Sequence, residues 1–249
     1  MNPDLSIVMP VYNEAHVIED VVAELTDQVC RHLPHSEIVM VNDASTDATP
    51  HILDRLATAD SRVRVFHAAH NGGHGPALRR ALDESRGTWI FQIDSDGQQL
   101  PAEFWELWRR RDHAELVMGV RQIRRNGRHR VVVSAAARAL NRALGGGNIR
   151  DVNVPFKLIH RDVWDDVRAS IPQRPVAPSL LVAVGAAVRG WRIDQVRVTH
   201  LPRRHGTSTV DLRALIRLSA GAAAELVAFR ARLARRRVAA RRPRSAEAV

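Results

Sequence analysis

Two aspartates one residue apart are the most informative chemical feature of the sequence. Asp94 and Asp96 flank Ser95, with Gln98 two positions on, directly after the apolar run 89–93. Two carboxylates in this arrangement can face one divalent ion, and Mg2+ and Mn2+ prefer hard oxygen ligands. An ion held there can bridge a diphosphate and neutralise the charge that develops as it leaves. A solvated turn explains the same triplet, because Asp, Ser and Gly are common turn residues, so the triplet alone leaves both interpretations open.

A second polar loop follows the apolar run 38–41 and contains Asp43, Ser45, Thr46 and Asp47. Its side chains are able to accept hydrogen bonds from a nucleobase or a ribose, although helix capping explains them at least as well. Glu14 has the same two interpretations, because the helix dipole favours an acid in the first turn of a helix.

Arginines supply the complementary positive charge. They cluster in two stretches, namely Arg121, Arg124, Arg125, Arg128 and Arg130, and then Arg203 and Arg204. A diphosphate leaving group or a phosphate acceptor needs such donors. For any single arginine, a solvated basic surface is the simpler interpretation.

The elements that must position these residues alternate between strand and helix. The expected strands cover 5–9, 38–41, 63–66, 89–93 and 115–118, and the expected helices cover 17–29, a segment opened by Thr49 and Pro50, 77–86 and 101–111. Asn13 is expected to cap the first helix. This alternation predicts an α/β fold with a mostly parallel sheet and helices on both faces. Ligands of such sheets bind beyond the carboxyl ends of the strands, where the loops 10–14, 42–47 and 94–98 lie.

The second half of the chain is less regular. We expect a basic loop over 121–130, an alanine-rich helix over 131–144, strands near 155–159 and 193–200, and an apolar helix at 179–188. A loop over 202–209 precedes a long helix from 211 to about 237 and a disordered end. The sequence Gly73-His74-Gly75 faintly imitates a dinucleotide-binding fingerprint, but Leu78 stands where the third glycine belongs.

Composition limits the classes of protein. The chain has 249 residues and is 45% hydrophobic, which suits one α/β domain. The formal net charge is +10, but residues 230–244 contain eight arginines and no acid, so the body is nearly neutral. A basic tail attracts phosphates of lipid or nucleic acid alike. Aromatic residues make up only 4% of the chain, so a nucleic-acid-binding module with stacking aromatics is not expected.

The expected compartment is the cytoplasm. One cysteine, Cys30, excludes a disulfide framework within the chain, and its apolar helical context is typical of a buried thiol. We find no secretory signal and no charge-free stretch long enough for a transmembrane helix. The protein is therefore expected in the cytoplasm, either free or peripheral at the inner face of the membrane.

Taken together, these segments resemble the family 2 glycosyltransferases, and among them the dolichol- or polyprenol-phosphate sugar synthases. The resemblance covers roughly 5–209 in a consistent order. It is carried by the segments 6–14, 41–47, 71–73 with Ala77 and Leu78, 93–98, Asp151 with Phe156 and Lys157, and Arg203 with Gly206 and Ser208.

The resemblance implies a GT-A fold over 1–210, with an amphipathic helix and arginine-rich tail over 211–249. It implies a metal-dependent, inverting transfer of a hexose from a GDP- or UDP-sugar to a polyprenyl phosphate, with Mg2+ or Mn2+ as cofactor. The implied nucleotide-binding residues are Pro10, Tyr12, Glu14, Val41, Asp43, Asp94 and Ser95. Asp94, Asp96 and Gln98 are the implied metal ligands, and Asp96, Arg121, Arg130 and Arg203 the implied catalytic residues. Lys157 and Ser208 are weaker candidates for the acceptor phosphate.

Some alternatives remain open from the sequence. The family often has two acids where this chain has Asn42 and Asp43, and commonly glycine where it has Pro155. A saccharide acceptor would need a carboxylate base, because a neutral hydroxyl must lose a proton, and we identify no such base. The stretch 211–244 is expected either to lie in a membrane interface or to pack on the catalytic body. A degenerate relative that only binds nucleotide, or a nucleic-acid-binding protein using its basic tail, is a less favoured alternative.

Overall fold

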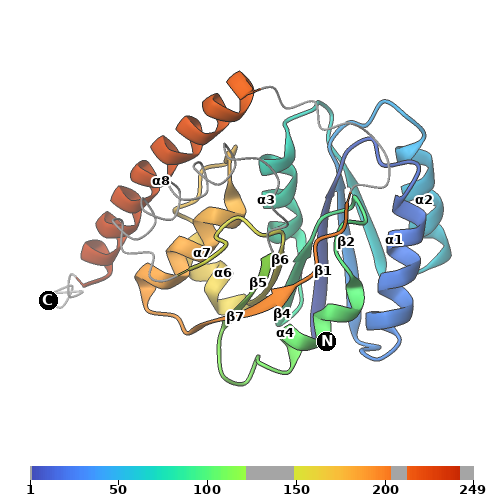
Figure 1. Cartoon of the computed structure of the whole chain (residues 1–249), viewed down its shortest axis with the longest axis horizontal. Helices are drawn as coiled ribbons and strands as arrows, with labels where there is room; N and C mark the ends of the chain where they lie inside the picture. Colours follow the sequence, from blue (N-terminus) through green and yellow to red (C-terminus); the bar gives the residue numbers. More distant parts are fainter. Residues whose placement is uncertain (1, 122–148, 203–211, 242–249) are drawn as a thin grey trace, which may run out of the picture.

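The structure is a computed structural model that describes the backbone of residues 2–121, 149–202 and 212–241, with side chains of the last range described over 220–235. Its centre is a seven-stranded sheet with the order β3-β2-β1-β4-β6-β5-β7 (Figure 1). The strands are β1 (Leu5–Val11), β2 (Ser36–Asn42), β3 (Val63–His67), β4 (Trp89–Ile93), β5 (Leu116–Arg121), β6 (Phe156–His160) and β7 (Ile193–Val198).

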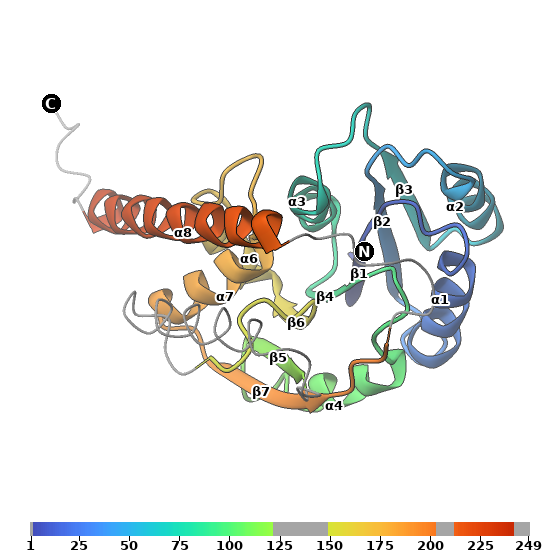
Figure 2. The ribbon, with the colours of Figure 1, turned by 45° about the horizontal axis from the view of Figure 1, so that its top comes forward.

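The sheet is mostly parallel, as the alternation of elements predicts. β1 pairs in parallel with β2 and β4, β2 with β3, and β5 with β7, whereas β6 runs antiparallel between β4 and β5. The helices α1 (Ile18–Leu25), α2 (Thr49–Ala59) and α4 (Phe104–Trp108) cover one face. The other face carries α3 (His74–Glu84), α6 (Arg161–Arg168) and α7 (Pro178–Arg189), with α8 (Leu212–Arg241) outermost (Figure 2).

The first half of the chain matches the predicted elements closely, with small shifts at their ends. Pro50 lies in the first turn of α2, where its missing N–H costs nothing. The prediction that Asn13 caps the first helix is wrong, because α1 begins at Ile18 with no side-chain cap, and a π-helical turn (Thr26–Cys30) extends it. Cys30 is buried and free, as expected.

In the second half, β6, α7 and β7 are confirmed, and α6 is an additional helix that the sequence did not reveal. Its apolar side chains Val163, Trp164 and Val167 are buried against the body. The predicted basic loop 121–130 and the alanine-rich helix 131–144 lie outside the described residues, apart from Arg121.

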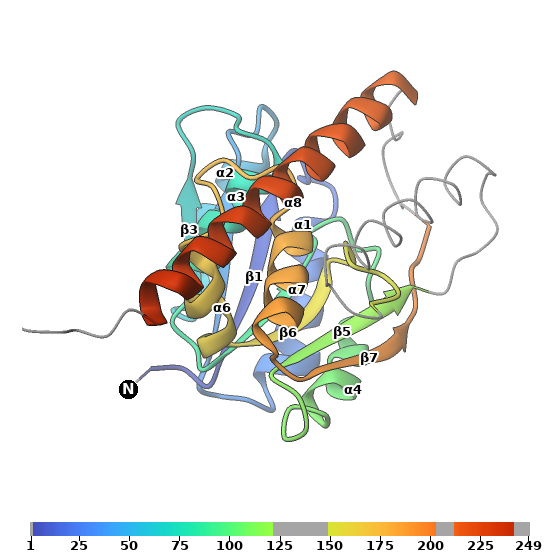
Figure 3. The same cartoon turned by 90° about the vertical axis from the view of Figure 1, so that its left-hand side faces the viewer.

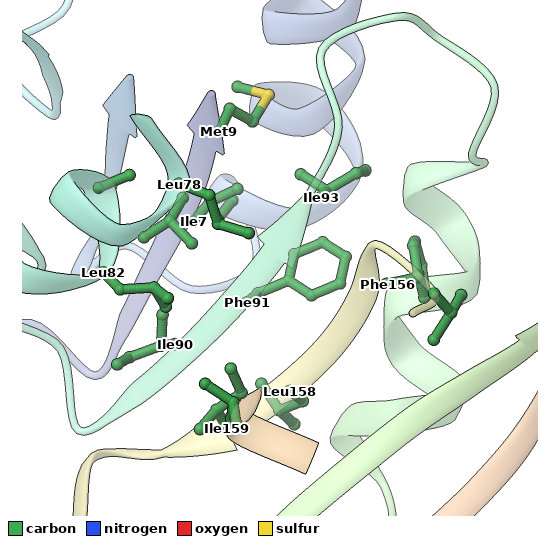
Figure 4. Close-up of a cluster of buried hydrophobic side chains, with 14 of the residues drawn as sticks. Ile7, Met9, Leu78, Leu82, Ile90, Phe91, Ile93, Phe156, Leu158 and Ile159 are labelled. Atoms are coloured by element: carbon green, nitrogen blue, oxygen red, sulfur yellow. The ribbon is translucent and has the colours of Figure 1, made fainter. Parts of the chain in front are cut away.

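The core lies between the sheet and its helices. Every residue of β1 is buried, because helices cover both faces of the sheet and the strand has no solvent side. Figure 4 shows Leu78 of α3 beside Ile7 of β1, Leu82 of α3 beside Ile90 of β4, and Phe91 of β4 beside Phe156 of β6. The rings of Phe91 and Phe156 meet edge to face, with centroids 4.9 Å apart.

The long helix α8 packs on the body of the fold and crosses α7 (Figure 3). Leu226, Phe229 and Leu233 face inward and join the main core. Gly185 of α7 admits the Phe229 ring, since a Cβ at Gly185 would lie 3.0 Å from its Cζ atom. Of the two expectations for this helix, packing on the body is therefore confirmed for the described face. No helix in the described part of the chain is both long and apolar enough to cross a membrane.

Candidate active site

The loops that follow β1 and β2 are joined by hydrogen bonds at the carboxyl edge of the sheet. The Asn13 amide donates to Ser45 Oγ at 2.9 Å, and the Thr46 amide donates to Asn13 Oδ1 at 2.8 Å. Asn13 adopts a left-handed conformation with φ of 53°, which asparagine tolerates better than most residues. Glu14 is held nearby, because its amide donates to Thr49 Oγ1 at 2.9 Å. Asn13 therefore fastens the two loops together instead of capping a helix.

Asp43 is almost fully buried and anchors the turn that precedes α3. Its two carboxylate oxygens accept hydrogen bonds from the amides of Gly72 at 2.8 Å and Gly73 at 2.7 Å. Gly73 has φ of 89°, a conformation that favours glycine. The Val41 side chain is also buried, whereas Tyr12 is 46% exposed. The Tyr12 ring is thus partly accessible at this edge.

The paired carboxylates lie where β4 ends. Ser95 between them is buried, and its hydroxyl donates to the carbonyl oxygen of Pro10 at 2.9 Å, which ties this loop to the end of β1. Asp96 Oδ1 accepts from the Gln98 amide at 3.1 Å. Asp94 Oδ1 is buried and has no hydrogen-bond partner among the described residues. A buried carboxylate oxygen without a donor suits a cation that binds there.

Charged groups from other elements surround Asp94. Burial raises the pKa of the Asp94 carboxyl to about 6. The positive charge of His74 opposes this rise in pKa, and the negative charge of Asp96 adds to it. Arg121 and Lys157 also oppose the rise, which places both cations within electrostatic range. The fold thus gathers charged residues from the loop after β4, from β5 and β6, and from the start of α3 around the Asp94 carboxylate.

Arg121, at the end of β5, is held in a two-pronged ion pair. Its Nε atom donates to Asp151 Oδ2 at 2.8 Å and its Nη2 atom donates to Asp151 Oδ1 at 3.0 Å. Bidentate pairs of this kind fix the plane of a guanidinium as well as its position. Asp151 belonged to the sequence resemblance but was given no role in the site, and the structure shows that it orients a candidate catalytic arginine.

His200 is a site residue that the sequence analysis missed. Burial lowers its pKa, Arg121 lowers it further, and the charges of Asp96 and Asp151 oppose the change. Its Nδ1 atom is buried and has no hydrogen-bond partner within the described residues. Among twelve histidines without metal-ligand spacing, no local signal distinguished this one.

Two contacts bring His200 to the paired carboxylates. The Leu201 amide donates to the Gln98 carbonyl at 2.8 Å, and Gln98 Nε2 donates to the Leu201 carbonyl at 2.9 Å. On the other side, Thr199 Oγ1 donates to Glu103 Oε1 at 2.7 Å. The segment after β7 is therefore clamped onto the loop after β4. Gln98, a predicted metal ligand, uses its amide nitrogen in this clamp.

The surroundings of Lys157 differ from those of a residue that binds the acceptor phosphate. It is fully buried, and its ammonium group donates to backbone carbonyl oxygens. Burial lowers the pKa of Lys157 to about 7, opposed by the negative charge of Asp151. We therefore remove Lys157 from the candidate acceptor ligands. Three other predicted residues, Arg130, Arg203 and Ser208, lie outside the described residues.

The site residues fit a divalent ion only if a ligand completes the coordination. Within 2–121, 149–202 and the described side chains of α8, no group of three His, Cys, Asp or Glu side chains is arranged to hold a metal. Asp94 and Asp96 supply two hard carboxylates, and one oxygen of Asp94 lacks a donor. Magnesium commonly binds through one or two carboxylates and completes its shell with substrate phosphates and water. The residues present suit that mode of binding.

The glycine pair around His74 has a packing explanation. An ideal Cβ at Gly75 would lie 1.8 Å from the carbonyl oxygen of Pro175. Gly75 is needed because the backbone of Pro175 and Val176 approaches α3 at this point. The dinucleotide interpretation, already weak in the sequence, gains no support from this geometry.

Comparison with known proteins identifies the family. The sequence profile of glycosyl transferase family 2 matches residues 6–168, which is well over half of the chain. The chain therefore belongs to glycosyl transferase family 2. The matched range contains Asp43, Asp94, Asp96, Arg121, Asp151 and Lys157, whereas the segment 199–201 with His200 lies beyond it.

Individual relatives agree with the family assignment. The chain is 30% identical over 217 residues to glycosyltransferase AglD of Haloferax volcanii, covering 84% of this chain and 34% of AglD. It is 28% identical over 216 residues to polyprenol monophosphomannose synthase of Mycolicibacterium smegmatis, covering 82% and 80% respectively. The chain spans about two thirds or less of the length of two further curated relatives, namely 65% and 64%.

A solved structure confirms the fold. Glucosyl-3-phosphoglycerate synthase from Mycobacterium tuberculosis, in complex with Mn2+, UDP-glucose and phosphoglyceric acid, superposes with a TM-score of 0.67. The match covers 92% of this chain and 80% of that chain at 22% sequence identity. The predicted GT-A fold is therefore confirmed.

Proposed function

We propose that this glycosyltransferase moves a hexose, with inversion, from a nucleoside diphosphate sugar to a polyprenyl phosphate. The observation that carries the proposal is the arrangement around Asp94, where paired carboxylates lie within electrostatic range of the anchored guanidinium of Arg121 at the carboxyl edge of the sheet. A diphosphate with its divalent ion matches this combination of charges. The names of relatives support the choice of substrates, since one is a polyprenol monophosphomannose synthase.

The donor occupies the edge formed by the ends of β1, β2 and β4 in this proposal. Tyr12 stacks on the base, and the loop around Glu14 and Asp43 encloses the nucleoside with Pro10 and Val41 as its floor. Asp94 and Asp96 would hold Mg2+ or Mn2+, which would supply positive charge to neutralise the leaving diphosphate. Gln98 either donates its side-chain oxygen to the metal as a ligand or only holds the loop 94–98 in place through its bond to Leu201.

The acceptor phosphate acts as the nucleophile in this reaction. One of its anionic oxygens forms a bond to the anomeric carbon while the bond from that carbon to the diphosphate oxygen breaks. Because the nucleophile is already charged at neutral pH, the chain needs no general base. Catalysis then consists of positioning and charge stabilisation, for which Arg121, with Arg130 and Arg203, provides the donors. Ser208 remains a candidate ligand of the acceptor phosphate.

We also propose that the stretch 211–244 contacts the membrane surface from the outer side of α8. The described outward positions of α8 are small and apolar, with Val227 53% exposed, and Arg235 is exposed beside them. Together with the eight arginines of 230–244, a small apolar helix surface suits an anionic bilayer that carries the lipid phosphate. Sedimentation with vesicles should show binding to phosphatidylglycerol and little binding to phosphatidylcholine. Equal binding to both, or to neither, contradicts this part of the proposal.

The transfer itself is tested with a labelled donor and three acceptors. Undecaprenyl phosphate should be glycosylated in the presence of Mn2+, whereas undecaprenol without its phosphate should not. Phosphoglyceric acid tests whether any phosphate suffices. Asp96→Ala should abolish the transfer while leaving the protein folded. Transfer to undecaprenol, or transfer by Asp96→Ala at the wild-type rate, would refute the proposed reaction.

A further inference from the structure

Lys157 is a buried cation that the proposed reaction does not use directly. Its Nζ atom donates to the carbonyl oxygens of Val152 at 3.0 Å and Val154 at 2.9 Å. It also donates to the carbonyl oxygen of Ser179 at 3.1 Å and contacts the hydroxyl of that residue. An ammonium group has three donors, so these acceptors account for all of them. Lys157 therefore has no donor left for a substrate.

The acceptors of Lys157 belong to two segments that are far apart in sequence. Val152 and Val154 lie in the segment 149–155, which leads into β6, and Ser179 lies in the first turn of α7. Ser179 Oγ adds a contact to the Val154 carbonyl oxygen at 3.3 Å. One ammonium group thus fastens the segment 149–155 to α7.

The segment 149–155 carries the partner of Arg121. Asp151 directly precedes Val152, whose carbonyl Lys157 binds, and Asp151 holds the guanidinium of Arg121 through both oxygens. The Arg150 amide makes a further anchor by donating to Gln195 Oε1 at 2.8 Å. The position of the Arg121 guanidinium therefore depends on how the segment 149–155 is held.

Stability alone gives a weak reason for a lysine at this place. Burying an ammonium group is costly even when it is hydrogen-bonded, and an apolar side chain of similar volume is often as stable in such a site. The directed bonds of Lys157, in contrast, fix two carbonyls on either side of Asn153 and so define the path of the chain after Asp151.

We propose that Lys157 is a positioning residue for the transfer. It holds the segment 149–155 so that Asp151 keeps the Arg121 guanidinium directed toward the diphosphate beside Asp94. This inference rests on the proposed function, because the orientation of Arg121 affects turnover only if a diphosphate binds at that edge.

The test compares Lys157→Met and Asp151→Asn, singly and together. Arg79→Met is the matched control, because Arg79 is also a buried cation that donates to carbonyl oxygens, including that of Pro172 at 2.9 Å. The first readout is hydrogen exchange of the 149–154 amides in the protein without ligand. The second is the rate of Mn2+-dependent hydrolysis of UDP-glucose or GDP-mannose, whichever the wild type hydrolyses faster, per mole of folded protein.

Lys157→Met should speed exchange over 149–154, and Arg79→Met should not. A misplaced donor typically costs about 100-fold in rate, so Lys157→Met and Asp151→Asn should each slow hydrolysis by about that factor. If both act through Arg121, the double variant should also be slowed about 100-fold, whereas independent effects would multiply to about 10,000-fold. Arg79→Met should lower stability and leave the rate unchanged.

Two results would overturn the inference: unchanged exchange over 149–154 in Lys157→Met, or independent, multiplying effects of the two substitutions on hydrolysis. A wild-type protein that neither binds nor hydrolyses either donor with Mn2+ counts against the proposed function instead. The exchange measurement needs no ligand, so it still decides whether Lys157 holds the segment that carries Asp151.

Discussion

Replacing Gly75 with alanine places a methyl group where the backbone of Pro175 already lies. The added Cβ would be 1.8 Å from the Pro175 carbonyl oxygen and 2.9 Å from its carbonyl carbon. Since carbon and carbonyl oxygen normally approach to about 3.3 Å, the segment 172–177 must retreat by about 1.5 Å. The methyl group cannot be accommodated by a side-chain movement, because the atoms it meets belong to the backbone.

That retreat disturbs contacts with α8. The amides of Val176 and Ala177 donate to the Glu225 carboxylate at distances from 2.9 to 3.1 Å. Overpacking costs about 1 to 3 kcal/mol, and each weakened hydrogen bond costs about 1 kcal/mol more, so we expect Gly75→Ala to destabilise the fold by about 3 kcal/mol. For a chain of this size the midpoint of thermal unfolding should fall by about 6 to 12 °C.

Gly221→Ala is the matched control because both glycines lie in helices. At Gly221 the nearest atom to an added Cβ is Val176 Cγ2 at 3.9 Å, an ordinary contact. Alanine favours the helix by about 1 kcal/mol there, so the midpoint should rise by about 2 to 4 °C. Thermal unfolding followed by circular dichroism measures both variants. If Gly75→Ala leaves the midpoint unchanged or raises it, the close approach of Pro175 to α3 is wrong.

Two further predictions concern Asp94 and α8. The pKa of Asp94 is raised from 3.8 to about 6 in the folded protein. Between these two pH values the folded protein binds a proton at Asp94 that the unfolded chain does not bind. The contribution of Asp94 to the free energy of unfolding therefore falls as pH rises from about 4 to 6. Denaturant unfolding in EDTA should therefore show that the free energy of unfolding of Asp94→Asn, relative to that of the wild type, rises by up to about 3 kcal/mol from pH 4 to pH 6. A difference between the two proteins that does not change with pH would contradict the raised pKa. Phe229→Ala should cost about 4 kcal/mol because the ring is fully buried, and Val227→Ala, at 53% exposure, less than about 0.5 kcal/mol. Equal losses in the two α8 variants, measured by the same unfolding, would contradict the packing of α8.

The sequence predicted most of the carboxyl edge of the sheet because that edge is built from local signals. Each of β1, β2 and β4 is a short apolar run that ends in a polar loop, and parallel strands bring such ends together. The sequence analysis did not predict the additional helix α6, because its eight residues are too few for the apolar spacing to indicate a helix.

Contacts between segments that are far apart in sequence account for the other features that the sequence did not predict. The antiparallel position of β6 between β4 and β5 is not encoded in any local pattern. Lys157 lies between Phe156 and Leu158, and all three are buried because the sheet is covered on both faces, so alternation gives no guide to its direction. His200 reaches the site only because Gln98 and Leu201 pair across the end of the fold.

The most direct test of the central claim is the thermal stability of the protein with UDP, GDP, dTDP and CMP, each with and without Mn2+. A ligand that binds only the folded state stabilises it by about 2.7 kcal/mol at a hundred times its dissociation constant, which corresponds to a rise of about 5 to 11 °C. We predict a Mn2+-dependent rise with one of the nucleoside diphosphates, and its loss in Asp96→Asn. No rise with any nucleotide from folded protein, or an equal rise without Mn2+, would contradict a metal-assisted diphosphate site at Asp94 and Asp96.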